Sequence, residues 1–404
     1  MKTLNLPTIL YALAIGSLAW SRAAHSALSL LAIVLFFIQS PQPIRLGRLP
    51  YLKHLLAVLG LIAFSCLYAD DFSLALDDIG GMWPIIHLFL APFILQNKNM
   101  KAFTFIVVGV ATLGGMFSIF QELGFISYKS KVSGNVATSD TWAFVDCLTY
   151  AIPVAFFVTL QGNKIYHKLF LLPVFIMTYS LWITQQRANF IAAACCIVIV
   201  ALLHNRSSKK TRTMVLATIV VAAALITTYS DSAIGDLDDV FTDNPAEFIH
   251  PLRAAQYEIA LEAIEQSPVI GHGFGSYTTF ERDFIALNPE AEKILGSNTG
   301  IVRVHNNIMH TLVSSGIVGL IIASCLFFKI LWHLLKHVKS NNQAALLGIS
   351  ACAIHFITGL TDYPSYYSKR LAIFTIAIGF AYGALLSTER EALNNNPEPT
   401  LPNG

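Results

Sequence analysis

The sequence predicts an all-α polytopic membrane protein with about twelve transmembrane helices and one large outer loop that itself contains helices. Of its 404 residues, 55% are hydrophobic and 12% are charged, and the mean hydropathy is +0.60. Soluble globular chains carry about 25% charged residues, so this composition excludes that class. Apolar runs close to the roughly 20 residues that span a bilayer recur along the chain. They cover residues 6–21, 24–40, 53–69, 80–96, 102–121, 143–161, 167–185, 188–204, 213–229, 306–335, 343–360 and 371–387.

The distribution of lysine and arginine between alternate loops predicts the orientation of these spans. If the N-terminus is cytoplasmic, most basic residues of the short loops lie on the cytoplasmic side, including four between His204 and Thr213. The positive-inside rule then places both termini in the cytoplasm. The same alternation puts the long polar interval of residues 230–304 on the outer face.

The spans divide the chain into four parts. Residues 1–229 form helices one to nine with short loops, residues 230–304 form the large outer loop, and residues 305–387 form helices ten to twelve. Residues 388–404 are polar and rich in Asn and Pro, which predicts a disordered cytoplasmic tail.

The cysteines predict neither disulfides nor a metal site. All six lie inside or at the end of a predicted span, and their spacing is not that of metal ligands. They are interpreted as small apolar residues of the bundle. They are Cys66, Cys147, Cys195, Cys196, Cys325 and Cys352.

Charged residues also occur in the outer loops that precede the long one. Lys129 and Lys131 could bind an anionic phosphate, but a solvated loop is the favoured interpretation. Asp146, just inside the sixth span, is expected to face protein or water because a carboxylate in lipid is costly. A solvated loop is also favoured, over an acid facing a cleft, for Asp70, Asp71, Asp77 and Asp78.

The turn between the seventh and eighth spans carries an arginine. Its sequence is Thr184-Gln185-Gln186-Arg187-Ala188-Asn189. Arg187 could extend toward lipid headgroups or could face a ligand, and the sequence favours the two about equally. A planar, permanently charged guanidinium suits a diphosphate, because it can make two parallel contacts with it.

The large outer loop begins with acids and continues into a predicted helix. Asp236-Leu237-Asp238 matches the Asp-x-Asp pattern of transferases that use nucleotide sugars, but those donors are cytoplasmic, so a solvated segment is favoured. Arg253 lies in the first turn of the helix, where the dipole disfavours cations, which indicates another role such as binding an anion. It neighbours Tyr257 four residues on. The apolar face of the helix contains Leu252, Ile259, Ala260 and Ala263.

His305 opens the tenth span and follows Arg303 by two residues. A histidine at a membrane interface is commonly structural. At the mouth of a cleft, however, its ordinary pKa of about 6.5 would let it transfer protons. Asp362, in the last outer loop, is one more acid at a helix end.

These motifs, taken in order, resemble the O-antigen ligase family. The resemblance covers residues from about 180 to 362, and a chain without an added soluble domain favours the ligase branch over the related protein O-oligosaccharyltransferases. The motifs are Thr184-Gln185-Gln186-Arg187-Ala188, the Arg253 and Tyr257 helix, Ser267-Pro268 before Gly271-His272-Gly273-Phe274-Gly275, and His305-Asn306-Asn307 before Ser315-Gly316-Ile317-Val318-Gly319.

The resemblance implies a GT-C-like glycosyltransferase of the bacterial inner membrane, inverting and without metal or cofactor. It would transfer a glycan from undecaprenyl diphosphate to a sugar hydroxyl of lipid A–core oligosaccharide at the periplasmic face, and it would bind no nucleic acid. By motif position, Arg187 and Arg253 would bind the diphosphate, and His305 would activate or orient the acceptor hydroxyl. The supporting candidates are Gln186, Tyr257, Arg303, Asn306, Asp362, Lys129 and Lys131.

Two alternatives remain open. An O-antigen polymerase would use the same donor with a second lipid-linked glycan as acceptor. A flippase for lipid-linked oligosaccharides would place ionisable residues along a central cavity, whereas here the polar residues gather at the outer helix ends.

Overall fold

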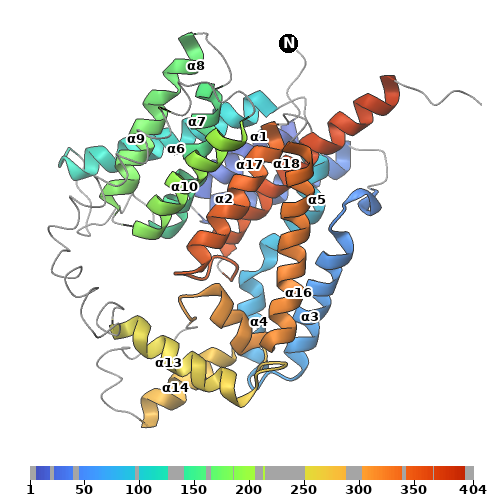
Figure 1. The fold of residues 1–404 in the computed structure, drawn as a ribbon, viewed down its shortest axis with the longest axis vertical. Coiled ribbons are helices and arrows are strands. Elements are labelled where there is room, and N and C mark those ends of the chain that lie inside the picture. The colour runs from blue at the N-terminus through green and yellow to red at the C-terminus, as the bar shows by residue number, and fades with distance from the viewer. Residues whose placement is uncertain are drawn as a thin grey trace, which may run out of the picture.

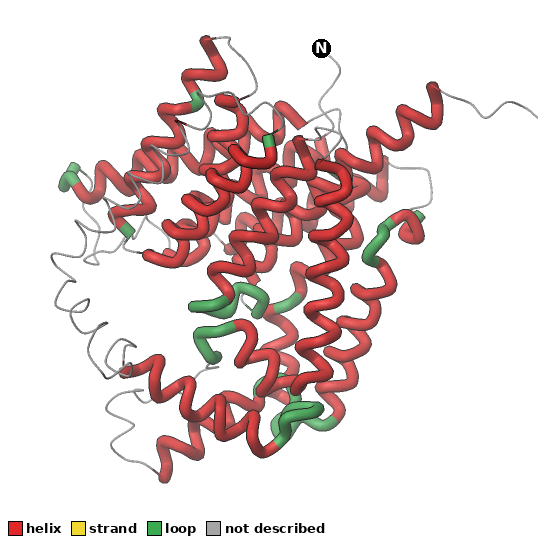
Figure 2. The backbone as a smooth tube through the Cα atoms, viewed as in Figure 1, coloured by secondary structure: helices red, strands yellow, loops and turns green. Residues whose placement is uncertain are grey.

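The computed structural model describes residues 6–18, 22–39, 45–95, 100–125, 141–160, 165–184, 186–204, 213, 251–287, 303–338, 343–366 and 368–395. Every regular element within these ranges is a helix (Figures 1 and 2). Most helices form a bundle, and α13 and α14 form a separate layer at one end of it (Figure 1). The all-helical fold predicted from the apolar runs is therefore confirmed for the described residues.

The helix bounds follow the predicted runs closely. The first half of the bundle comprises α1 (Leu6–Leu18), α2 (Arg22–Gln39), α3 (Leu52–Leu67), α4 (Phe72–Gly81), α5 (His87–Ile94), α6 (Met100–Glu122) and α7 (Thr141–Leu160). The remaining helices are α8 (Ile165–Leu169), α9 (Leu171–Ile183), α10 (Arg187–Leu203), α13 (Pro251–Gln266), α14 (Ser276–Leu287), α16 (Asn307–Val338), α17 (Gln343–Gly359) and α18 (Ser368–Asn395). Two short 3-10 helices are η1 (Leu46–Arg48) and η2 (Trp83–Ile86).

Helix α18 occupies the centre of the bundle. It packs against α5, α7 and α17, and α17 in turn packs against α10 and α16. One apolar core gathers residues of α1, α6, α7 and α9, and a second gathers residues of α3, α16, α17 and α18. The start of α18 lies close to α7 and α10, because Arg370 bonds Asp146 of α7, which also accepts from Asn189 of α10, and this is where the candidate site is found.

Fewer helices than the sequence predicted are long enough, on their own, to span a membrane. Among the described residues, three helices are long and apolar enough to cross a membrane: α6, α16 and α18. A fourth crossing exists if α4 and η2–α5, bent by 50°, form one broken span. The other apolar helices contribute apolar stretches of 10–17 residues, such as Phe144–Leu160 within α7, and all but one residue of the predicted span 213–229 lies outside the described residues. The chain is a multi-pass membrane protein, and the number of twelve spans stays a prediction.

The layer formed by α13 and α14 is joined by backbone hydrogen bonds to a kink in α16. Gly316 has a φ of 58°, which interrupts the helix and exposes its backbone groups. The carbonyl of Val313 accepts from His272 N at 2.8 Å, and the N–H of Ile317 donates to Pro268 O at 2.9 Å. The turn between α13 and α14 thus satisfies backbone groups that the kink leaves without helical partners.

The glycines of that turn permit a backbone conformation and a close approach that other residues would not. Gly271, Gly273 and Gly275 all have positive φ, which other residues rarely adopt. A Cβ on Gly271 would lie 2.5 Å from Ser315 N, so only glycine permits this approach. The predicted inward face of α13 is also confirmed, because Ile259, Ala260 and Ala263 are fully buried.

Two expectations about loops are corrected. The acidic segment after α3 contains helix α4, whose start is capped by the Asp71 carboxylate accepting from the N–H groups of Ser73 and Leu74. At the other end of the chain, α18 continues to Asn395, so the first part of the predicted tail is helical.

Candidate active site

The segment before α16 is held against the loop between α17 and α18. The Asn306 side chain accepts from the N–H groups of Ile308 and Met309 at 2.9 and 3.1 Å, which caps α16. Its Nδ2 donates to the carbonyl of Leu360 at 2.9 Å. Asn306 is therefore a structural residue that fixes the position of the neighbouring His305.

His305 is paired with Asp362 at the edge of the bundle. Its Nδ1 lies 3.2 Å from Asp362 Oδ1, and the His305 side chain is 23% exposed. The ring also contacts Tyr363 edge-on, with 5.1 Å between ring centroids. A carboxylate partner favours the proton on Nδ1, so the other ring nitrogen, Nε2, can accept a proton from a bound hydroxyl.

The α13 layer reaches His305 directly. Tyr257 donates from its hydroxyl to the backbone carbonyl of His305 at 3.2 Å. Arg253 lies one turn earlier on the same helix and is partly exposed. The structure thus places Arg253 on the helix that contacts His305, although its side chain has no described contact with that histidine.

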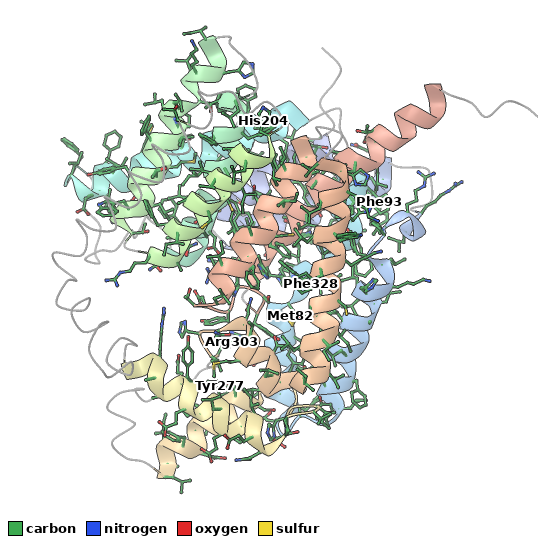
Figure 3. The ribbon with its side chains drawn as sticks, in the orientation of Figure 1. Met82, Phe93, His204, Tyr277, Arg303 and Phe328 are labelled. Carbon is green, nitrogen blue, oxygen red and sulfur yellow. The ribbon has the colours of Figure 1, made fainter. Side chains whose placement is uncertain are left out.

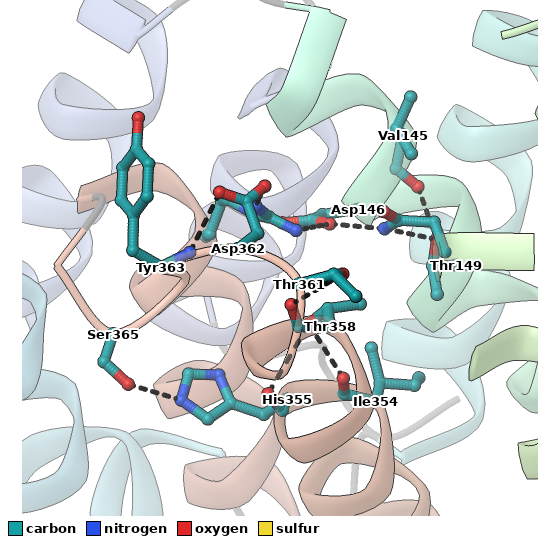
Figure 4. Close-up of polar contacts among 12 residues, drawn as sticks. Val145, Asp146, Thr149, Ile354, His355, Thr358, Thr361, Asp362, Tyr363 and Ser365 are labelled. Carbon is teal, nitrogen blue, oxygen red and sulfur yellow. Dashed lines mark hydrogen bonds and ion pairs between the residues drawn. The ribbon is translucent and has the colours of Figure 1, made fainter. Parts of the chain in front are cut away.

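Behind Asp362 lies a buried ion-pair network that the sequence did not reveal. Arg370, at the start of α18, bonds the second oxygen of Asp362 through Nη1 and contacts Asp146 of α7 through Nε and Nη2, the latter at 3.1 Å. Figure 4 shows Asp362 and Asp146 near each other, with Thr149 beyond Asp146. Asn189 of α10 completes the network, because its Nδ2 donates to Asp146 Oδ1 at 2.7 Å and to Thr149 Oγ1 at 3.1 Å.

The charge state of Asp362 follows from these neighbours. Burial alone would raise the pKa of this carboxyl, but the Arg370 guanidinium and His305 outweigh burial and lower the pKa to about 2. Asp362 is therefore ionised throughout the physiological range. It supplies His305 with a permanent negative partner.

A second buried pair lies closer to the kinked helix. Asp78, fully buried in α4, accepts from Arg303 Nε at 2.7 Å and from the N–H of Gly275 at 3.3 Å. His310 Nε2 lies 3.6 Å from the same carboxylate. Figure 3 shows Arg303 on the side of the bundle that faces α13 and α14. The expectation that this acid lies in a solvated loop is wrong, because α4 turns Asp78 inward to neutralise Arg303.

Arg187 is the first residue of α10, and its side chain is exposed. Helix α10 begins on the side of the bundle that faces α13 (Figure 1). Gln186 precedes it at the cap position and makes no capping bond through its side chain. The direct meeting of Arg187, Arg253 and His305 stays a prediction, and Lys129 and Lys131 lie outside the described residues.

Within the described ranges, no group of three or more His, Cys, Asp or Glu side chains could hold a metal ion. Four arginines are candidate cations at this end of the bundle: Arg187 and Arg253 at helix starts, and Arg303 and Arg370 in buried pairs. Of these four, Arg187 and Arg253 are exposed enough to meet an anionic ligand.

The fold and the site together define a multi-pass helical membrane protein with a histidine–carboxylate pair and arginines at one end of its helices. Residues 172–324 match the O-antigen ligase family, so the chain contains an O-antigen ligase domain. No curated protein matched the chain. The matched range includes Arg187, Arg253 and His305, whereas Asp78, Asp146, Asp362 and Arg370 lie outside it.

Proposed function

We propose that the protein is an O-antigen ligase. It transfers a glycan from undecaprenyl diphosphate to a sugar hydroxyl of lipid A–core oligosaccharide and so completes lipopolysaccharide. The observation that carries this proposal is the His305–Asp362 pair at an exposed end of the bundle, at 3.2 Å, inside a chain that carries the ligase domain. The donor and acceptor are both lipids, which is consistent with a site at the end of membrane helices.

In the proposed reaction, His305 Nε2 takes the proton of the acceptor hydroxyl while the hydroxyl oxygen attacks the anomeric carbon. The bond from that carbon to the diphosphate breaks, and the configuration at the carbon inverts. The diphosphate already carries two negative charges and gains one more as it leaves, and Arg187 and Arg253 stabilise this charge as fixed cations in place of a metal ion. Asp362 stabilises the imidazolium that forms on His305.

The proposed topology places this site at the periplasmic face of the bacterial inner membrane. Both termini are cytoplasmic, residues 230–304 form the large periplasmic loop, and about twelve spans give a GT-C-like arrangement. The basic loops described from the sequence support this orientation. The donor's polyprenyl chain then remains in the bilayer while its diphosphate meets the arginines at the surface.

The proposal is tested by transfer in vitro from a defined lipid-linked glycan to purified lipid A–core. The wild-type protein should attach the glycan with and without chelator, and His305→Ala should not. A chelator that stopped transfer would instead implicate a metal ion and refute the metal-free mechanism.

A polymerase is the second candidate, because it would use the same lipid-linked donor and the match to residues 172–324 does not fix the acceptor. It would extend one lipid-linked glycan with another and leave lipid A–core unmodified. Offering both acceptors in the same assay decides between them. A flippase would move the donor across vesicles and modify neither acceptor.

A further inference from the structure

Arg370 joins two parts of the site that the proposed reaction must use together. One part is the start of α10, which carries Arg187, and the other is the His305–Asp362 pair. We propose that Arg370 is a positioning residue that fixes the diphosphate-binding end of α10 relative to the catalytic histidine. This inference rests on the proposed function, since it assigns the two ends to donor and acceptor.

On the α10 side, the network is contacted by the side-chain amide of Asn189. Asn189 lies two residues after Arg187 and is buried, and it donates to both Asp146 and Thr149 at 2.7 and 3.1 Å. The Thr149 hydroxyl is itself oriented, because it donates to the carbonyl of Val145 at 2.7 Å. This leaves the hydroxyl oxygen as an acceptor for Asn189. The first turn of α10 is thus anchored to α7 at a defined point.

The contacts on the histidine side are made through a carboxylate. Asp362 uses one oxygen for His305 Nδ1 and the other for Arg370 Nη1. Its Oδ1 also accepts from the N–H of Tyr363 at 2.9 Å, so the carboxylate has little rotational freedom. A shift of Arg370 would therefore move Asp362 and change the orientation of the imidazole.

Only arginine can make both sets of contacts at once. Its planar fork presents Nε and Nη2 to Asp146 and Nη1 to Asp362. A lysine offers one ammonium group and cannot hold two carboxylates in this geometry. All three side chains are nearly fully buried, so removing one partner leaves an uncompensated buried charge.

The charge balance of the network also favours the proposed chemistry. Two carboxylates share one guanidinium, so with both carboxylates ionised and His305 neutral the network has an excess of one negative charge. Proton uptake by His305 from the acceptor neutralises that excess. Arg370 therefore holds the carboxylates in place without cancelling the charge that the imidazolium needs.

The first experiment measures KM and kcat in the transfer assay with purified protein, so that effects at the start of α10 are distinguished from effects at the His305–Asp362 pair. Asn189→Leu removes the α10 contacts and should raise the KM for the lipid-linked donor about tenfold, with kcat within about twofold. Asp362→Asn should lower kcat by about a hundredfold with little change in donor KM. Arg370→Lys should both raise the donor KM and lower kcat.

The combined effect of two substitutions on the donor KM distinguishes coupling from a merely structural role. If Arg370 couples the two ends, the double variant Asn189→Leu with Arg370→Lys should have the same donor KM as Arg370→Lys alone. Thr375→Val is the control, because this buried residue lies on the same helix and its described hydrogen bonds all go to backbone carbonyls, those of Leu371, Ala372 and Pro84. It should leave both constants unchanged. Independent, multiplicative effects in the double variant would overturn the proposal.

A second measurement does not depend on activity. Hydrogen exchange should become faster at the start of α10 and in residues 303–309 in Arg370→Lys, and in neither segment in Thr375→Val. If Arg370→Lys loosens only one segment, the coupling is refuted. If the wild type transfers no glycan, the proposed function fails, and hydrogen exchange alone then decides whether Arg370 joins the two segments.

Discussion

A buried glutamate in α14 provides a stability test of the layer that carries Arg253 and Tyr257. The Glu281 side chain is 2% exposed, and its Oε1 atom has no described hydrogen-bond partner. It lies on the same helix face as Tyr277, which packs in the apolar core of the α13–α14 layer. Burial raises the pKa of this carboxyl to about 7 from an ordinary value of 4.5.

The sign of the pH effect follows from that shift. Below pH 4.5 the carboxyl is protonated in both folded and unfolded protein and has no effect. Between pH 4.5 and about 7 the folded state binds more protons than the unfolded state, so stability falls as pH rises. The full difference corresponds to about 3 kcal/mol, and relaxation of protein and water around the new charge reduces the expected cost to about 2 kcal/mol at pH 8.

Glu281→Gln removes the charge and keeps the shape, so it should stabilise the layer by about 2 kcal/mol at pH 8 and by less than about 1 kcal/mol at pH 5. The assay is hydrogen exchange of α13 and α14 at both pH values, with thermal unfolding as a second probe. Asp283→Asn is the matched control, because Asp283 is an exposed carboxylate on the same helix. Equal effects of Glu281→Gln at the two pH values, or a loss of stability at pH 8, would refute the reasoning.

Two further predictions concern packing and charge. Asp78→Ala should cost about 3–5 kcal/mol of stability because it leaves the Arg303 guanidinium buried without its carboxylate, and Asp78→Ala with Arg303→Met should recover part of that loss in thermal unfolding. Gly316→Ala should cost about 1–3 kcal/mol, because φ is 58° there and a Cβ would lie 2.3 Å from the Val269 backbone. The control is Gly60→Ala in α3, where a Cβ would meet nothing within 4 Å; it should be neutral or slightly stabilising. A Gly316→Ala variant as stable as the wild type would show that the kink does not need glycine.

The apolar runs were enough to locate most of the described helices, since the runs that predicted spans coincide with α1–α3, α5–α7, α9, α10 and α16–α18, whereas α4, α8 and α14 were not predicted. Helical periodicity also predicted the inward face of α13 correctly. Span number was harder to predict, because loops and kinks divide apolar runs into helices shorter than a bilayer is thick. Composition cannot tell a short buried helix from a tilted or broken crossing.

The ion pairs of the site could not be predicted from the chain because each joins residues far apart in sequence. Arg303 and Asp78 are separated by 225 positions, and Arg370 and Asp146 by 224. One signal was present: a carboxylate just inside a span was expected to face protein or water, and Asp146 is indeed 2% exposed and paired. Its partner could not be identified, because Arg370 lies at a helix start where a basic residue also fits a headgroup contact.

The most direct test of the proposed function is transfer of a lipid-linked glycan to purified lipid A–core by matched wild-type and variant proteins. We expect transfer by the wild type in the presence of chelator, and loss of transfer with intact membrane insertion in His305→Ala, Arg187→Ala and Arg253→Ala. Near-normal transfer by His305→Ala would contradict the account, because the His305–Asp362 pair would then take no part in activating the acceptor.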